Sequence, residues 1–118
     1  MSKRDSLLYI VDILDSIDAI EEYLENTNYE TFCSDRKTYA ATIREFIIIG
    51  EAINKIMDIL QASYPEYPWR ILKDFRNFIV HEYFGVNPQI VYDAAKQELE
   101  EVKNIMIQLK ETSARQPL

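Results

Sequence analysis

Hydrophobic residues recur at three- and four-residue steps from the start of the chain, which is the spacing of an amphipathic helix. The repeat predicts one long helix from about residue 3 to about residue 26. Ser2 and Asp5 have capping-box spacing at its start, and the polar run at 26–28 is expected to end it. Its outer face carries mainly carboxylates, so we expect a solvated surface there.

A second helical repeat follows a short connector at residues 29–34. Ser34 or Asp35 can cap this helix, and the repeat continues to about residue 60. Gly50 lies in its middle, where glycine costs about 1 kcal/mol relative to alanine. Since such a glycine is useful where another group approaches closely, we expect a packing notch at Gly50.

The segment 64–68 separates the second helix from a third, which starts at Trp69 and should loosen after His81. A last helix is expected from residue 88 to about residue 110, followed by a frayed tail at 111–118. These elements predict an all-α protein, most simply an up-down bundle of four or five helices. A chain of 118 residues has the length of one domain, so we expect residues 1–118 to form a single unit.

Composition narrows the setting in which the protein acts. Two Gly and four Pro argue against a turn-rich β architecture. No run of about 18 apolar residues occurs, so we expect no membrane-spanning segment. The first residues do not resemble a signal peptide, and the single Cys33 cannot form an internal disulfide. These features fit a protein of the reducing cytoplasm.

The net charge of −7 disfavours general nucleic-acid binding, because attraction to phosphates dominates non-specific affinity. The acidic residues concentrate towards the two ends of the chain, whereas the segment 70–76 is locally basic. A nucleic acid would therefore have to be bound by this local patch.

The segment 69–85 has the clearest separation of polar and apolar residues and contains the only Trp and the only His. On a helix, one stripe holds Arg70, Lys73, Asn77 and His81, with Asp74 beside it and Arg76 at its edge. The opposite face, expected to be buried, holds Ile71, Leu72, Phe75, Phe78 and Ile79. Such a helix can present cations and an imidazole to a polyanion. An ordinary solvated face, with a histidine that interacts with the helix dipole, is the alternative.

These residue types fit the cleavage of RNA without a metal ion. One His and one Cys provide no zinc-binding motif, and isolated glycines provide no phosphate-binding loop. Cleavage at the 2′-hydroxyl needs a base, an acid and cations for the phosphate. An imidazole suits the proton transfers, and a guanidinium suits a two-pronged contact with phosphate. We therefore expect neither a metal nor a cofactor. A magnesium site made of carboxylates is the alternative, although no cluster of carboxylates lies in the segment 69–85.

Arg76 and His81 are separated by five residues, which on a straight helix turns their side chains about 140° apart. They converge only if the helix unwinds at His81 or if a second copy of the chain supplies the facing group. A symmetric dimer with antiparallel central helices would bring two copies of each residue into one cleft. The apolar Val80, within the polar stripe, suits such an interface.

The order of these residues resembles the R-x-x-x-x-H-x-Y signature of HEPN-domain RNases of the HepT toxin type. The resemblance rests on Arg76, His81 and Tyr83, on Asn77 directly after the arginine, on Pro68-Trp69 upstream, on Tyr83-Phe84-Gly85-Val86 downstream, and on Ile49-Gly50-Glu51-Ala52 in the second helix. The helical order fits along nearly the whole chain.

The resemblance implies an α-helical homodimer that cuts RNA, either tRNA or mRNA, without a metal in a cleft at the dimer interface. Arg76 and His81 would be the catalytic pair, while Asn77 would orient them or bind phosphate. Tyr83 would shape the cleft, and Glu51 would lie near it. Arg70 and Lys73 would contribute to RNA binding.

The resemblance also implies a partner, a small nucleotidyltransferase antitoxin that can transfer AMP to the tyrosine of the motif, here Tyr83. Phosphates two residues from His81 would occupy the anion site and repel RNA. Tyr83 as a simple packing residue and Glu51 as an ordinary surface residue are the alternatives. A helical dimer that serves the nucleotidyltransferase as a non-catalytic substrate- or nucleotide-binding subunit is the competing function, and a purely structural dimer is a third.

Overall fold

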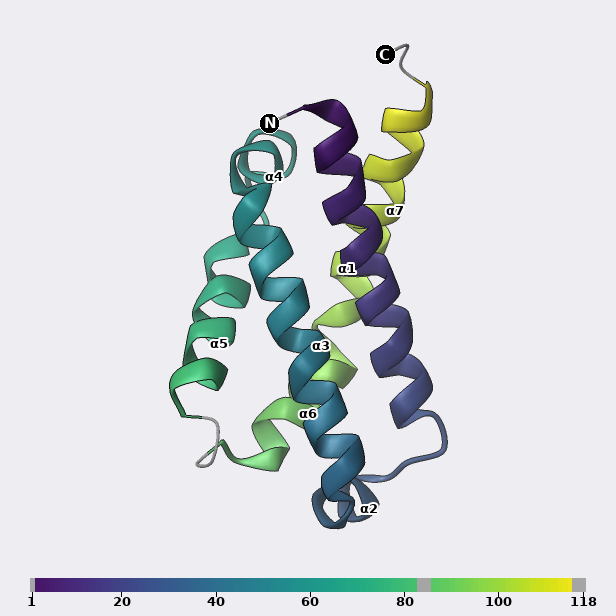
Figure 1. Ribbon diagram of the computed structural model, residues 1–118, viewed down its shortest axis with the longest axis vertical. Helices are drawn as coiled ribbons and strands as arrows, with labels where there is room; N and C mark the ends of the chain where they lie inside the picture. The colour runs from purple at the N-terminus through teal and green to yellow at the C-terminus, as the bar shows by residue number, and fades with distance from the viewer. Residues whose placement is uncertain (1, 83–85, 116–118) are drawn as a thin grey trace.

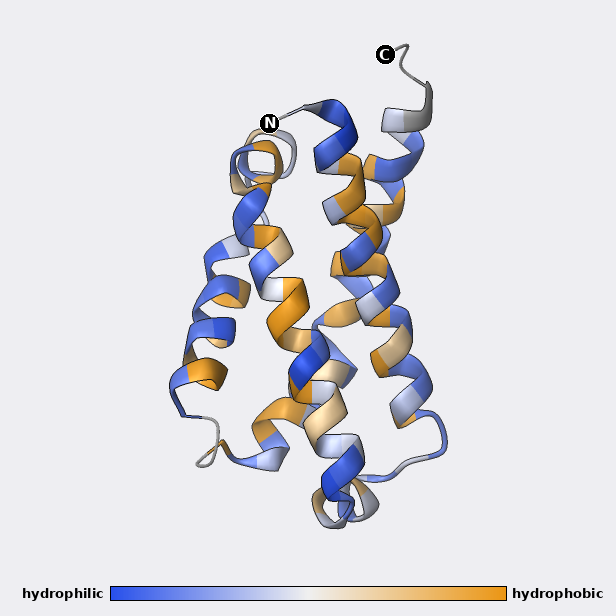
Figure 2. Ribbon diagram, in the orientation of Figure 1, coloured by the Kyte–Doolittle hydropathy of each residue, from blue (hydrophilic) through white to orange (hydrophobic). Residues whose placement is uncertain are grey.

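The computed structural model describes residues 2–82 and 86–115, and within these ranges it contains seven α-helices and no strand (Figure 1). The helices are α1 Lys3–Leu24, α2 Tyr29–Ser34, α3 Arg36–Lys55, α4 Met57–Ser63, α5 Trp69–His81, α6 Pro88–Gln97 and α7 Leu99–Arg115. The all-α fold class is therefore confirmed. Figure 2 shows hydrophobic and hydrophilic residues interspersed along the long helices, as expected for amphipathic helices.

The expectation of four or five helices is corrected to seven in the described residues, because two expected helices are interrupted and the connector at 29–34 is itself a helix. The second is broken at Ile56, which separates α3 from α4, and the last is broken at Glu98, which separates α6 from α7. Ile53 and Leu60, on either side of the first break, are both buried. The hydrophobic repeat runs across a break that keeps these side chains pointing inward, so periodicity alone does not detect it.

The connector expected at 29–34 is also helical, as α2. The side chain of Asn28 accepts a hydrogen bond from the Thr31 backbone N–H at 2.8 Å, so the polar run that ends α1 also starts a new helix. Phe32 is fully buried and packs edge-to-face on Tyr39 of α3. Asp35, one of the two expected caps, accepts from the Thr38 N–H at 3.2 Å and begins α3.

The tail expected to fray from residue 111 remains in α7 as far as Arg115. The hydroxyl of Thr112 donates to the Gln108 carbonyl at 2.9 Å, which is a bond within the helix. The last three residues of the chain lie outside the described ranges. Among the helices described, none combines the length and the apolar character needed to cross a membrane.

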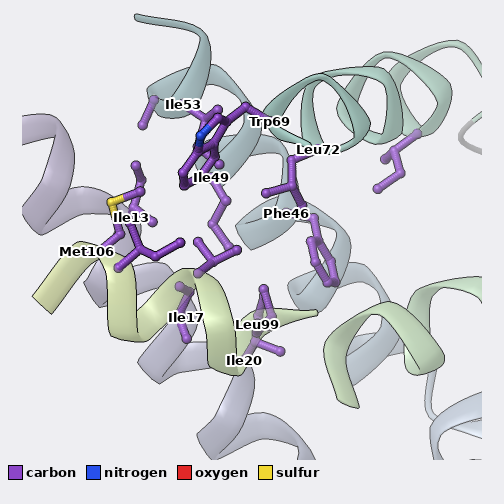
Figure 3. Close-up of a cluster of buried hydrophobic side chains, with 14 of the residues drawn as sticks. Ile13, Ile17, Ile20, Phe46, Ile49, Ile53, Trp69, Leu72, Leu99 and Met106 are labelled. Carbon is purple, nitrogen blue, oxygen red and sulfur yellow. The ribbon is translucent and has the colours of Figure 1, made fainter. Parts of the chain in front are cut away.

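Helix α3 is the centre of the bundle, since it packs against α1 on one side and against α5 on the other. Helix α1 also packs against α7, whereas α5 lies at the edge of the bundle (Figure 1). The core is formed by side chains from α1, α3, α5 and α7 that meet between the helices (Figure 3), among them Ile13, Ile17, Ile20, Phe46, Ile49, Ile53, Trp69, Leu72, Leu99 and Met106. The indole Nε1–H of buried Trp69 donates to the Tyr64 carbonyl at 3.0 Å, which fixes the start of α5.

Candidate active site

Helix α5 carries most of the predicted site residues, and its edge position decides which of its faces is exposed. It packs chiefly against α3, with a smaller contact to α4, so it buries only a narrow stripe that includes Trp69, Leu72 and Ile79. Ile71 is 59% exposed and Phe78 is 41% exposed, so the expectation that the whole apolar face is buried is wrong for these two residues. A helix with neighbours on one side cannot bury the flanks of a wide apolar face.

Gly50 permits α5 to approach α3 closely. A Cβ atom placed on Gly50 would overlap the Cβ of Arg76 and lie 2.7 Å from its Cγ. The stem of Arg76 therefore lies directly over the glycine. It occupies the space that a side chain at position 50 would fill. The packing notch expected at Gly50 is confirmed, and the group that fills it is Arg76.

The guanidinium of Arg76 is held by two side chains. Its Nη2 donates to Glu51 Oε1 at 2.7 Å, and its Nη1 donates to Asn77 Oδ1 at 3.0 Å. Its Nε is buried and has no hydrogen-bond partner among the described residues. The side chain of Arg76 is 30% exposed and that of Glu51 is 55% exposed, so water screens the ion pair. An incoming anion can therefore compete with Glu51 for the guanidinium.

A cavity of about 350 Å³ opens beside this ion pair, between α3 and α5, and we call it the α3–α5 cleft. Its lining consists of three cationic residues, two amides, one carboxylate and a glycine, namely Lys55, Lys73, Arg76, Asn54, Asn77, Glu51 and Gly50. The formal charge of this lining is +2, although the chain as a whole carries −7. The cleft is thus a local cationic site of a size that admits a small ligand.

Two of these lining residues, Asn54 and Lys55, were not among the predicted site residues. The sequence did contain a signal for one of them, because Lys55 follows Glu51 by four residues and therefore shares its helix face. Asn54 had no comparable signal.

The structure brings Glu51, Lys73, Arg76 and Asn77 together and leaves two predicted residues outside the cleft. Arg70 is exposed and does not line the cleft. His81 is exposed at the end of α5, and it does not line the cleft either. Since α5 is helical through His81, the five-residue separation places His81 and Arg76 about 140° apart around the helix. Tyr83 lies outside the described residues.

The chain is fixed on both sides of the segment that follows His81. The backbone N–H of Glu82 donates to the Phe78 carbonyl at 2.9 Å and closes the end of α5. The hydroxyl of Tyr39 donates to the carbonyl of buried Val86 at 3.0 Å, which ties the start of the next segment to α3. Sequence reasoning did not identify Tyr39, because nothing local connects it to a residue 47 positions away.

Comparison with known proteins identifies the family to which the chain belongs. The family model described as "Ribonuclease HepT-like" matches residues 13–109. A Methanocaldococcus jannaschii protein named "Putative RNase" is 36% identical over 103 residues, which cover 87% of this chain and 85% of that protein. A Thermococcus cleftensis protein named "Probable ribonuclease HepT" is 36% identical over 101 residues, which cover 86% of this chain and 92% of that protein. No solved structure gives a significant match. The chain therefore belongs to the HepT-like ribonuclease family.

Proposed function

We propose that this protein is a metal-independent endoribonuclease toxin that acts on tRNA or mRNA in the cytoplasm, with Arg76 and His81 as its catalytic pair. The observation that supports the proposal is that contacts from α3 and α5 fix the side chain of Arg76 in place. Its stem rests on Gly50, its guanidinium contacts Glu51 and Asn77, and it faces a cleft that contains two further cations. A cation fixed in this way suits a phosphate whose charge increases during cleavage.

Arg76 would bind the scissile phosphate and stabilise the charge that develops on its oxygens. The planar guanidinium has five N–H donors, of which Glu51 and Asn77 occupy two. Asn77 keeps the group oriented while a phosphate oxygen replaces or joins Glu51. Glu51 therefore has a supporting role, since it holds Arg76 in place before RNA arrives.

His81 would act as the acid or base that transfers a proton during cleavage at the 2′-hydroxyl. Its position requires a second copy of the chain. A neutral or protonated imidazole can serve as base or acid near neutral pH. Because His81 and Arg76 point about 140° apart on one helix, we propose a symmetric homodimer in which His81 of one copy completes the cleft of the other. The exposed apolar side chains of Ile71, Phe78 and Val80 on α5 support a contact with another chain along this helix.

We further propose that a nucleotidyltransferase antitoxin neutralises the protein by transferring AMP to Tyr83. Tyr83 follows His81 by two residues in the sequence, so an added phosphate group would place negative charge close to the proposed proton-transfer group. RNA, which carries the same sign of charge, would then be excluded.

A non-catalytic subunit of the nucleotidyltransferase is the second candidate function. One observation favours it, namely that a single chain leaves His81 outside the cleft that contains Arg76. Such a chain can bind a phosphate without cutting the bond.

The test is to incubate purified wild type and His81→Ala with total tRNA in EDTA and to resolve the products on a gel. We expect cleavage by the wild type and none by the variant, with both proteins equally folded and of unmodified mass. Cleavage by both proteins would contradict the assignment of His81. Cleavage by neither would favour the non-catalytic subunit.

A further inference from the structure

We infer that Lys55 and Lys73 form a second phosphate subsite in the α3–α5 cleft, which binds the RNA backbone phosphate next to the one held by Arg76. This inference rests on the proposed function, because it assigns a second contact between the protein and its RNA substrate. It deepens that function by adding Lys55 and by giving Lys73 a defined place.

The two lysines lie side by side because α3 and α5 run in opposite directions (Figure 1). The pair formed by Glu51 and Arg76 fixes the register of the two helices at 2.7 Å. From Glu51, Lys55 lies four residues further along α3, a rise of about 6 Å. From Arg76, Lys73 lies three residues back along α5, a rise of about 4.5 Å in the same direction. Both lysines therefore lie one turn from the ion pair, towards α4, and both line the cleft.

The lysines differ from Arg76 in their charge balance. Arg76 is paired with Glu51, whereas neither Lys55 nor Lys73 forms an ion pair with any residue in the described ranges. Two ammonium groups that have no ion pair among the described residues favour an anion between them in the cleft, and Asn54 adds an amide donor there. A phosphate diester meets these requirements, and RNA provides one on each side of the scissile phosphate.

The position of the subsite predicts an effect on binding more than on chemistry. In the proposed dimer, His81 of the other copy transfers the proton, and Arg76 contacts the scissile phosphate. Lys55 and Lys73 lie about one helical turn from Arg76 and take no part in either step. Their removal should raise KM for RNA and leave kcat nearly unchanged.

The experiment compares wild type with the double variant Lys55→Gln/Lys73→Gln on a single-stranded RNA oligonucleotide. We expect KM to rise about tenfold, since contacts between charged partners are lost, and kcat to stay within about twofold. The slope of log Kd against log salt, measured with protein that also carries His81→Ala, should fall by about 0.7 for one lost phosphate. The matched control is Lys37→Gln/Lys110→Gln, which removes the same charge from exposed positions on α3 and α7 and should leave both values unchanged.

Thermal melting of each variant separates loss of the subsite from loss of structure, because Lys55 also lies in the last turn of α3. An unchanged KM and salt slope in a folded double variant, with wild type active, would overturn the inference. The inference would also be overturned if the double variant lost affinity for AMP in solution and kept the wild-type affinity for RNA, because the lysines would then bind a mononucleotide. If wild type does not cleave RNA and the double variant still lowers the salt slope by about 0.7, the proposed function fails while the subsite stands.

Discussion

Two hollows on opposite sides of the bundle have opposite charge. The larger, about 790 Å³, lies between α1 and the helices α6 and α7, and we call it the α1–α7 hollow. Its charged lining contains five carboxylates and two lysines, a formal charge of −3, from Asp18, Glu21, Glu22, Glu25, Glu100, Lys96 and Lys103. The α3–α5 cleft is less than half as large and has a formal charge of +2.

Lys103 of the α1–α7 hollow and the two lysines of the α3–α5 cleft are also in different states. In the α1–α7 hollow, Lys103 Nζ contacts Glu21 Oε1 at 2.8 Å and Asp18 Oδ1 at 3.3 Å, so its charge is neutralised within the chain. In the α3–α5 cleft, Lys55 and Lys73 have no such partner among the described residues. The net charge of −7 is a sum over the whole chain and does not describe the charge of the cleft that carries the proposed site. The volume of a hollow does not identify the RNA-binding site either, because the larger hollow is acidic and repels a polyanion.

The largest expected effect comes from Arg76→Lys in the cleft. An ammonium cannot contact Glu51, Asn77 and a phosphate through one planar group, so the orientation of the cation is lost. We expect kcat for RNA cleavage to fall by about 10²- to 10³-fold, the usual cost of a transition-state contact. The control is Arg44→Lys, an exposed residue of α3 outside both hollows, which should keep wild-type kinetics. Full activity of Arg76→Lys would show that this arginine contributes only charge.

Gly50→Ala should have the second-largest effect, because the added methyl group pushes α3 and α5 apart. The added methyl group overlaps the Cβ of Arg76, so the helices must shift. We expect a loss of about 1–3 kcal/mol in the free energy of unfolding, measured with urea, and a marked loss of cleavage.

Adding Arg76→Gly to Gly50→Ala relieves the overlap and should make the two stability effects non-additive. Strict additivity would mean that Arg76 is not what fills the notch.

Lys103→Met in the α1–α7 hollow should have the smallest effect. Its ion pairs lie near the surface, so we expect a loss of at most about 1 kcal/mol and unchanged affinity for RNA. The hydrogen bond to Glu21, then that to Asp18, raises the pKa of the Lys103 ammonium above its ordinary value of 10.5. The difference in stability from wild type should therefore be present below pH 10.5 and be lost as the pH rises through the raised pKa. A drop in RNA affinity would contradict the contrast between the two hollows.

The sequence predicted the long helices, a cap at Ser34 or Asp35 and the notch at Gly50, because each depends on local spacing or on one residue type. It did not predict the breaks at Ile56 and Glu98, since buried side chains keep their period across them. The exposure of Ile71 also escaped prediction, because it depends on how many neighbours α5 has.

The cleft itself was only partly predictable. Arg76, Asn77 and Lys73 belong to one segment of the sequence, so their proximity followed from helical spacing. Glu51 entered through family resemblance, and Lys55 joins the cleft only because α3 and α5 pack antiparallel in one particular register. Such a register depends on tertiary packing, which a single repeat does not encode.

The most direct test of the proposed site mixes two inactive variants. Arg76→Ala and His81→Ala are purified separately, combined under conditions that exchange subunits, and assayed on total tRNA in EDTA. If each cleft takes Arg76 from one copy and His81 from the other, half of the randomly mixed dimers regain one of two sites, so about a quarter of the wild-type activity should return. An absence of activity after verified exchange, with active wild type beside it, would contradict a site shared between two copies.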